Sequence, residues 1–257
     1  MKNLLWGALA ALVLSGCNSF EKCGTVNPEV VVGKIDTPIV FDGKLDDAQW
    51  AKVPSYEFGY VDDVSEWPAA ERNRIRKDKY ESARVKFLYD DKYLYVGGEL
   101  DDDDVMAYLS GDQDMHYRSA DTLEIFLSPD KGPHYWELYA TPSKYRTTFF
   151  FPAGGMVGMS HLFVGSKLMP GYETAFAVKG TLNDSSDIDN GWTVEIRIPL
   201  SEIAAKGVKF DPSEKWHILA ARYNYSHYMY RRQNSSFPTL PVLNFHLRQY
   251  YAPVEFR

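Results

Sequence analysis

The sequence predicts an all-β protein: an antiparallel β-sandwich of the immunoglobulin-like or jelly-roll-like kind, with one or two short helical turns. Three observations predict it. Eight segments are rich in β-branched and aromatic residues, and many of them alternate in polarity. Clusters of Asp, Asn, Pro and Gly separate these segments as turns do. Helical patterns are few and short. Strands at such spacing bury their apolar faces best as two layers around one core.

The expected strands all lie after residue 80. They are Ala83–Tyr89, Tyr93–Leu100, Thr122–Leu127, Tyr135–Ala140, Tyr145–Phe151, Tyr172–Val178, Trp192–Ile198 and Trp216–Tyr225. The first two are expected to form a hairpin, because Asp90-Asp91-Lys92 between them is a turn sequence. Within the seventh strand, Trp192 lies on the apolar face and Glu195 on the other, so Trp192 is expected in the core.

Two short helical turns complete the pattern. Leu45–Lys52 follows Asp42-Gly43 and places Trp50 where it can anchor the turn to the core. Ser201–Lys206 follows a proline and is closed by Gly207, as expected for a single helical turn.

Length and charge limit the possible classes of protein. The 257 residues fit one large domain, and no linker-like stretch follows Val30, so residues 30–257 are expected to form a single domain. The apolar fraction of 45% is enough for a sizeable core. The formal net charge is −7, which argues against nucleic acid as a partner, since phosphate binding requires a basic surface. Aromatic residues make up 15% of the chain and favour strands and binding faces for flat ligands.

Residues 1–16 have the pattern of a lipoprotein signal peptide. Lys2 precedes an apolar run, Leu4–Leu14, that is too short to span a bilayer permanently. The run ends in Ser15-Gly16-Cys17, and small residues before a cysteine are typical of bacterial lipoprotein signals. Cleavage there would leave Cys17 as a lipid-bearing N-terminus. The alternative is an ordinary signal peptide with a chance cysteine.

The residues after Cys17 suggest a destination in the cell envelope. Asn18 follows the cysteine in place of an acidic residue, which favours the outer membrane over the inner one. Residues 17–29 would then form the lipidated cysteine and a polar tether. Cys23 is the only other cysteine, so an acylated Cys17 leaves no intrachain disulfide.

Common catalytic motifs are absent from the sequence. It contains no phosphate-binding glycine loop, no Cys-x-x-Cys, no His-Glu-x-x-His and no Gly-x-Ser-x-Gly. Four consecutive acidic residues, Asp101, Asp102, Asp103 and Asp104, follow a strand end and fit either a calcium site or a solvated acidic turn. No other cofactor is required by the sequence.

Five stretches of the chain occur in the order expected of one known family. They are Phe41–Trp50, Ala83–Val96, Asp121–Leu127, Gly191–Pro199, and Asn244–His246 with Val254–Phe256. Together they resemble carbohydrate-binding module family nine, in particular its lipoprotein and periplasmic relatives, over Ile35 to Phe256. The resemblance implies non-catalytic binding of a poly- or oligosaccharide by a lipid-anchored envelope protein, in polysaccharide capture or catabolism.

The resemblance also implies a set of site residues. In such modules two aromatic walls flank a sugar ring, and polar side chains bond its hydroxyl groups. Glu124 matches a polar site residue, and Tyr139 stands where the family has an arginine. Tyr117 is the candidate for one wall. The second wall is expected from the loop between Tyr225 and Asn244, where the candidates are Tyr228, Tyr230 and Phe237, with Phe237 in the favoured place. The family's binders use tryptophan for both walls, and no tryptophan stands in either place. We therefore expect Tyr117 and Phe237 to converge above Glu124.

Two further function classes stay open. A haem-binding electron-transfer module of similar fold would need a Met/His pair on facing strands. The candidates for that pair are Met115, His116, Met156, Met159 and His161. A glycoside hydrolase would need two carboxylates facing one cleft, and the available acids are Asp121, Glu124 and Glu195.

Overall fold

The structure is a computed structural model, and it describes residues 28–61, 80–165, 169–204, 210–229 and 231–257. The predicted signal peptide, Cys17 and Tyr230 lie outside these ranges. Within them, no helix combines the length and the apolar character that crossing a bilayer requires.

The described residues form thirteen strands and a few short helices. The strands are β1 (Val30–Lys34), β2 (Tyr56–Glu57), β3 (Gly59–Tyr60), β4 (Ala83–Tyr89), β5 (Tyr93–Leu100), β6 (Thr122–Pro129), β7 (Tyr135–Ala140), β8 (Arg146–Phe151), β9 (Glu173–Val178), β10 (Trp192–Pro199), β11 (Trp216–Asn224), β12 (Gln233–Phe237) and β13 (Ala252–Phe256). The helices are α2 (Leu200–Ala204) and the 3₁₀ turns η2 (Trp50–Lys52), η4 (His116–Arg118), η5 (Val157–Leu162) and η6 (Arg248–Tyr250).

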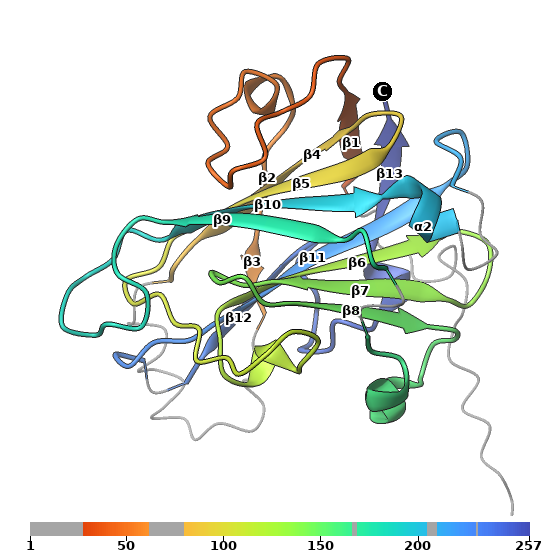
Figure 1. Cartoon of the computed structure of the whole chain (residues 1–257). Helices are drawn as coiled ribbons and strands as arrows, with labels where there is room; N and C mark the ends of the chain where they lie inside the picture. The colour runs from red at the N-terminus through yellow and green to blue at the C-terminus, as the bar shows by residue number, and fades with distance from the viewer. Residues whose placement is uncertain (1–27, 62–79, 166–168, 205–209, 230) are drawn as a thin grey trace, which may run out of the picture.

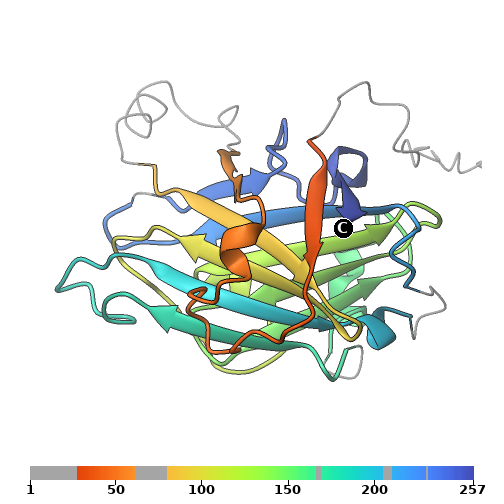
Figure 2. The same cartoon turned by 90° about the horizontal axis from the view of Figure 1, so that it is seen from above.

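All thirteen strands belong to one curved sheet. Its main path is β8-β7-β6-β11-β13-β1-β4-β5-β10-β9, and β12, β2 and β3 attach at its margins. The sheet folds back on itself, so that β4, β5, β10 and β9 lie over β6, β7, β8 and β11 (Figures 1 and 2). The all-β class is therefore confirmed, and the sheet is nearly closed into a barrel.

The pairing differs from the expected antiparallel arrangement at β1. This strand runs parallel to both of its neighbours. Its first half pairs with β13 and its last two residues, Gly33 and Lys34, pair with the end of β4. The first strand is therefore inserted between two segments that are distant in sequence, at the seam where one layer passes into the other, and this makes the sheet mixed.

The predicted hairpin is confirmed in β4 and β5. Tyr89 pairs with Leu94 at its end. Oδ1 of Asp90 accepts hydrogen bonds from the backbone N–H groups of Lys92 and Tyr93, both at 2.7 Å. The turn is thus stabilised by the side chain of its first residue, as Asp does in such turns.

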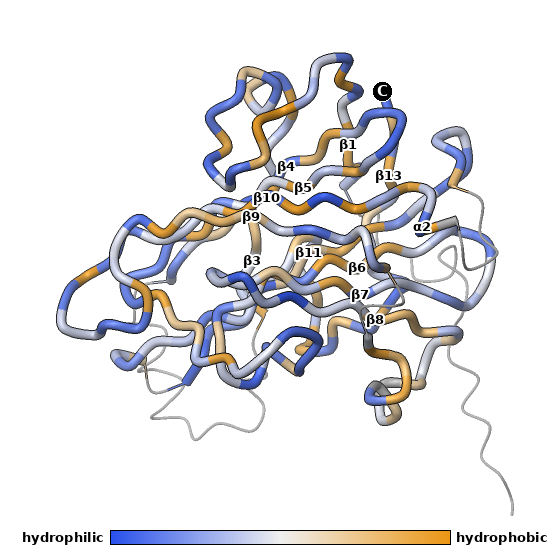
Figure 3. The backbone as a smooth tube through the Cα atoms, viewed as in Figure 1, coloured by the Kyte–Doolittle hydropathy of each residue, from blue (hydrophilic) through white to orange (hydrophobic). Residues whose placement is uncertain are grey.

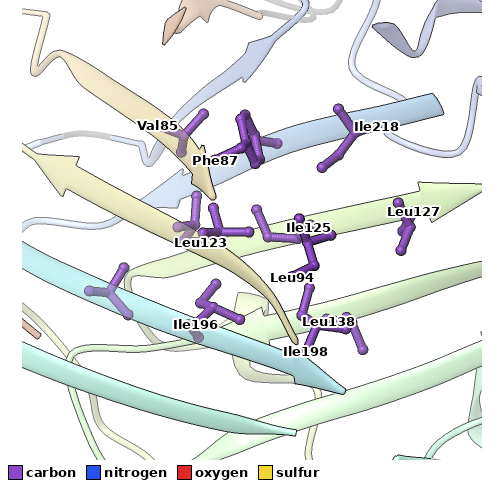
Figure 4. Close-up of a cluster of buried hydrophobic side chains, with 14 of the residues drawn as sticks. Val85, Phe87, Leu94, Leu123, Ile125, Leu127, Leu138, Ile196, Ile198 and Ile218 are labelled. Atoms are coloured by element: carbon purple, nitrogen blue, oxygen red, sulfur yellow. The ribbon is translucent and has the colours of Figure 1, made fainter. Parts of the chain in front are cut away.

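The core lies between the two layers. Apolar side chains of both layers point toward one another in Figure 4, including Phe87 and Ile196 from one layer and Ile125 and Leu138 from the other. Hydrophobic stretches alternate with hydrophilic ones along the strands, and the turn between β4 and β5 is hydrophilic (Figure 3). Trp192 is 1% exposed and belongs to this cluster, as predicted.

The helical turns are shorter than the sequence suggested. The helix expected over Leu45–Lys52 is reduced to η2, because Leu45 has a φ of 53°, which a right-handed helix excludes. Trp50 is buried, as predicted. The second turn is α2, which starts one residue earlier than expected, at Leu200.

Candidate functional site

A pocket of about 290 Å³ lies on the layer of β6, β7, β8 and β11, on the face that points away from the core between the two layers. We call the core between the two layers the shared core. That volume is at the lower end of the range for small-molecule sites. Strands β6, β7, β8 and β11 form its floor, and η4 and the loop at 243–246 supply the rest. Its lining residues are Met115, Tyr117, Glu124, Glu137, Tyr139, Phe149, Phe151, Tyr223, Leu243, Asn244, Phe245 and His246.

Strand alternation brings two acids into this pocket. Leu123 and Ile125 of β6 point into the shared core, so Glu124 between them points the opposite way. In the register of β6 with β7, Glu124 pairs with Tyr139, and Phe126 pairs with Glu137. Glu124 and Glu137 are therefore diagonal neighbours on one face of the sheet.

Both carboxyl groups are buried and incompletely bonded. Glu124 is 2% exposed and Glu137 3%. The hydroxyl of Tyr139 donates a hydrogen bond to Oε1 of Glu137. Oε1 of Glu124 and Oε2 of Glu137 have no hydrogen-bond partner. Buried acids without partners are costly, so this pair is unusual for a purely structural role.

Burial also changes the protonation of the pair. It raises the pKa of Glu137 to about 8, against the opposing effect of the Tyr139 hydroxyl. Burial and then the negative charge of Glu137 raise the pKa of Glu124 well above its usual range, opposed by Tyr139 and the charge of Arg232. The pocket therefore tends to hold protons on its acids at neutral pH.

A histidine beside the pair does not neutralise it. Nδ1 of His246 lies 3.7 Å from Oε2 of Glu137, too far for a hydrogen bond. The same nitrogen is 2.9 Å from the hydroxyl of Tyr135. Burial lowers the pKa of His246 to about 4, so its imidazole is neutral at physiological pH.

Tyrosine rings form the apolar part of the pocket. The ring centroids of Tyr117 and Tyr223 are 5.3 Å apart with planes inclined by 34°, and Tyr117 meets Tyr139 edge-on at 6.3 Å. The guanidinium carbon of Arg232 lies 4.5 Å from the centroid of the Tyr223 ring. Tyr117 and Tyr223 are thus neighbours that form a continuous aromatic surface.

The 3₁₀ turn that carries Tyr117 is held firmly. The hydroxyl of Tyr225 donates to the Tyr117 carbonyl at 2.7 Å. The preceding residue, His116, is buried, with Nε2 2.9 Å from the Gly111 carbonyl and Nδ1 3.1 Å from the Thr147 hydroxyl. Both nitrogens of this haem-ligand candidate are therefore engaged within the protein.

The structure brings together three of the predicted site residues, Tyr117, Glu124 and Tyr139. Phe237 lies elsewhere, because its side chain faces the shared core, where its ring is 4.8 Å from that of Tyr56. Tyr117 and Phe237 therefore do not converge above Glu124 as expected. Tyr230 lies outside the described residues.

Tyr228 also lies away from the pocket. Its ring is about half exposed, and its hydroxyl donates to the backbone carbonyl of Ser185 and, at 3.3 Å, to that of Asp187. The side chain is thus directed toward the loop that precedes β10, and the pocket lining does not include it.

Sequence reasoning missed Glu137, Tyr223 and the loop at 243–246. The alternation of side chains along the strands could have placed Glu137 on β7 and Tyr223 on β11. Trp136 and Leu138 are the apolar face of β7, so Glu137 had to share a face with Tyr139. The loop at 243–246 had no such signal, because only the fold brings it over the sheet.

Two other acids considered for hydrolysis serve the fold instead. Both oxygens of Asp121 accept backbone N–H bonds, from Met106 at 2.6 Å and Tyr225 at 2.7 Å. Glu195 accepts three bonds at 2.9 Å, two from the backbone of Asp42 and Gly43 and one from the Trp50 indole. Neither acid lines the pocket.

The acidic run after β5 forms several separate contacts. Asp102 is buried and pairs with the buried Arg222 at 3.0 Å. Oδ2 of Asp104 accepts the backbone N–H of His227 at 2.5 Å, and Asp101 accepts the hydroxyl of Ser82 at 2.5 Å. In the described part of the chain no group of three or more His, Cys, Asp or Glu side chains is arranged to hold a metal ion. A calcium site here stays a prediction from the sequence.

Comparison with known proteins connects this geometry to one family. Residues 40–211 match the family described as carbohydrate family 9 binding domain-like. That range contains the turn η4 and strands β6 to β8, and ends before β11. No curated protein matches the chain.

Solved structures share the fold at low sequence identity. A family 9 carbohydrate-binding module from Caldicellulosiruptor kristjanssonii, in complex with cellotriose, is 17% identical with a TM-score of 0.58, covering 90% of this chain and 94% of its own. A glucose complex of such a module from the same organism is 16% identical with a TM-score of 0.57, covering 90% and 96%. A putative carbohydrate-binding protein from Bacteroides uniformis is 14% identical with a TM-score of 0.64, covering 89% and 99%.

Proposed function

The chain belongs to the carbohydrate family 9 binding domain-like family, and on this premise we propose that it binds a carbohydrate without catalysis in the pocket on β6, β7, β8 and β11. One observation carries the proposal: a pocket of ligand size joins tyrosine rings to buried carboxyl groups with unused oxygens. A pyranose matches both parts, because it has an apolar C–H face and an edge of hydroxyl groups.

Each group has a distinct role in this proposal. Tyr117 and Tyr223 contact the C–H face of a sugar ring. Glu124 and Glu137 exchange hydrogen bonds with its hydroxyls, and a protonated carboxyl can both donate and accept. The curved sheet is the scaffold that holds them: Glu124, Glu137 and Tyr223 lie on its strands and Tyr117 lies on the 3₁₀ turn η4, and all but Tyr223 belong to the family-matching segment.

The ligands of the related structures support a saccharide as the ligand of this chain. The Caldicellulosiruptor modules hold cellotriose and glucose. A pocket of about 290 Å³ suits one or two sugar units rather than the side of a long chain. We therefore expect recognition of a short oligosaccharide or a chain end.

A glycan array with the purified chain tests this function, followed by calorimetry of the glycans that bind. We expect Tyr117→Ala to weaken binding at least tenfold, and Tyr228→Ala, which changes a tyrosine outside the pocket, to leave it unchanged. Incubation with the bound glycan should release no new reducing ends. Absence of any binding, or binding that survives Tyr117→Ala at full strength, contradicts the proposal.

We further propose that the protein is anchored to the bacterial envelope, in the outer membrane, by lipid at Cys17. The sequence pattern at residues 1–17 supports this. Several acyl chains on one residue hold a protein to a membrane stably, whereas a single chain does not. Cys17→Ala should abolish incorporation of labelled fatty acid and release the protein from membranes. Cys23→Ala is the matched control, and labelling that persists in the Cys17 variant contradicts the anchor.

A further inference from the structure

The polar groups of the pocket are unbalanced in charge. Two acids line it, and no lysine or arginine does. Each acid has an oxygen, Oε1 of Glu124 and Oε2 of Glu137, that is buried and has no partner. Two arginines lie beside the lining rather than in it: the guanidinium carbon of Arg232 is 4.5 Å from the centroid of the Tyr223 ring, and that of Arg118 is 5.6 Å from the centroid of the Tyr117 ring. Nothing in the lining therefore neutralises an ionised pair.

A neutral sugar brings no positive charge to the two acids of the pocket. Its hydroxyls can bond the two free oxygens only while at least one acid keeps its proton, because two adjacent buried carboxylates repel each other. An ammonium group removes the repulsion and donates up to three hydrogen bonds. Hydrogen bonds between charged groups are roughly twice as strong as neutral ones.

The apolar walls favour the same chemistry. Tyr117, Tyr139 and Tyr223 surround the pocket, with Phe149 and Phe151 on β8 beside them. The faces of aromatic rings attract cations, more strongly where water is excluded. Carboxyl groups enclosed by several aromatic rings are a combination suited to an ammonium ion.

We infer that the pocket prefers a carbohydrate that carries a free, positively charged amino group, in other words a deacetylated amino sugar. This inference rests on the proposed function and names the ligand class of the same site. The ammonium group lies between Glu124 and Glu137, and the sugar ring lies against Tyr117 and Tyr223.

Binding of a cation between the two acids should depend on pH. The ionisable groups around the acids are Tyr135 and Tyr139 from β7, Tyr223 from β11, Tyr251 and the loop residue His246, with Tyr117, Arg118 and Arg232 at the side. Burial raises the pKa values of Tyr135, Tyr139 and Tyr223, and His246 is neutral. The acids are therefore the groups that hold a proton in the empty pocket between pH 5.5 and 7 and can release it when a cation binds.

Binding of an ammonium ion must displace a proton from the acid pair. The affinity for an amino sugar should thus rise with pH over this range, approaching tenfold per pH unit for one released proton. The affinity for a neutral sugar should stay level or fall, because it uses the protonated form.

Calorimetry with matched sugars tests the inference. The sets are glucose, glucosamine and N-acetylglucosamine, and cellotriose with its β-1,4-linked glucosamine and N-acetylglucosamine counterparts. We expect the amino form to bind the purified full chain at least tenfold more tightly than the neutral forms at pH 7. The preference should shrink toward one at pH 5.5.

Two variants connect the preference to the acids. Glu137→Gln and Glu124→Gln keep the shape of the side chains and should each reduce the amino-sugar preference at least fivefold. Glu214→Gln, which changes an exposed acid paired with Lys131, is the matched control and should not alter it. Thermal melts establish that each variant is folded, and binding is compared only among the folded ones.

The outcomes separate this inference from the proposed function. Equal binding of amino and neutral forms overturns the inference and leaves the proposed function standing. A preference that persists in both glutamine variants, or that does not change with pH, also overturns it. If neither these sugars nor any glycan on the array binds, the proposed function fails together with the inference.

Discussion

Glu195 and the Glu124–Glu137 pair are buried acids on strands, and they differ in what surrounds their oxygens. Glu195 is fully buried, and its two oxygens accept three N–H bonds from the segment that precedes and includes Trp50. The pair is buried to the same degree, but two of its four oxygens have no partner. Burial is thus the same at both sites, and only the partners differ.

This difference separates a structural acid from a candidate ligand-binding one. The donors around Glu195 are supplied by the chain itself, so its carboxylate holds the loop at 42–50 on β10 and needs nothing else. The chain supplies too few donors for the oxygens of Glu124 and Glu137. The free-energy penalty of burying these oxygens is therefore reduced only when a proton or a ligand binds to them.

The largest effect is expected at Glu195. Glu195→Ala leaves three N–H donors without an acceptor, and we expect the free energy of unfolding to fall by about 3–5 kcal/mol. Denaturant titration measures it. Glu137→Gln should cost less than about 1 kcal/mol at pH 7. Equal losses at the two sites would remove the distinction between them.

The second-largest effect is expected in the pH dependence of the unfolding free energy, which should show the raised pKa of Glu137. The pKa of Glu137 is raised from 4.5 to about 8 by burial, so the folded state keeps a proton that the unfolded chain has lost. Stability is therefore greatest below about pH 4.5 and falls as pH rises toward about 8. We expect Glu137 to account for a loss of about 2 kcal/mol between pH 5 and 7.

Comparison with Glu137→Gln isolates this contribution, because glutamine does not titrate. The difference in unfolding free energy between the two proteins, measured at pH 5, 6 and 7, should move in favour of the variant. Parallel curves would show that Glu137 has an ordinary pKa, and that the pocket does not penalise its charge.

A smaller effect distinguishes the two aromatic candidates. Tyr117→Ala should cost about 1.4–3 kcal/mol of binding free energy, a tenfold loss or more, and little stability, because its ring is at the pocket. Phe237→Ala should reduce stability and leave the pocket intact, because Phe237 packs in the shared core. Calorimetry and thermal melts on both variants measure this, and the opposite pattern would place the site at Phe237.

The smallest effect is expected at Tyr228. Tyr228→Ala removes an exposed ring that lies outside the pocket, so binding and stability should each change by less than about 0.5 kcal/mol. A loss of glycan affinity in this variant would locate a second contact surface on the loop at 226–229.

The alternation of apolar and polar residues predicted the longer strands well, because every second side chain of a strand points into the core. The expected bounds of the hairpin over Ala83–Leu100 match β4 and β5. The strands that escaped prediction are short or polar. β12 reads Gln-Asn-Ser-Ser-Phe, and pairing with β11 rather than its own composition makes it a strand.

The site residues that lie on strands could be predicted from the sequence, and those that lie on loops could not. Glu124 and Tyr139 pair across β6 and β7, so period-two reasoning could place them together. Phe237 was assigned to the pocket by its position in a loop, but it ends a strand, and its side chain turns into the core. The approach of residues 243–246 to the sheet is a long-range contact that no local pattern encodes.

The structure of a complex would show directly whether a sugar occupies this pocket. Crystals grown with the best ligand from the glycan array should show a sugar ring against Tyr117 and Tyr223, with polar groups of the ligand within hydrogen-bond distance of Glu124 and Glu137. The two oxygens that are without partners should then have them. A sugar bound anywhere else on the molecule, with the carboxyl oxygens of the pocket still unpartnered, would contradict the account.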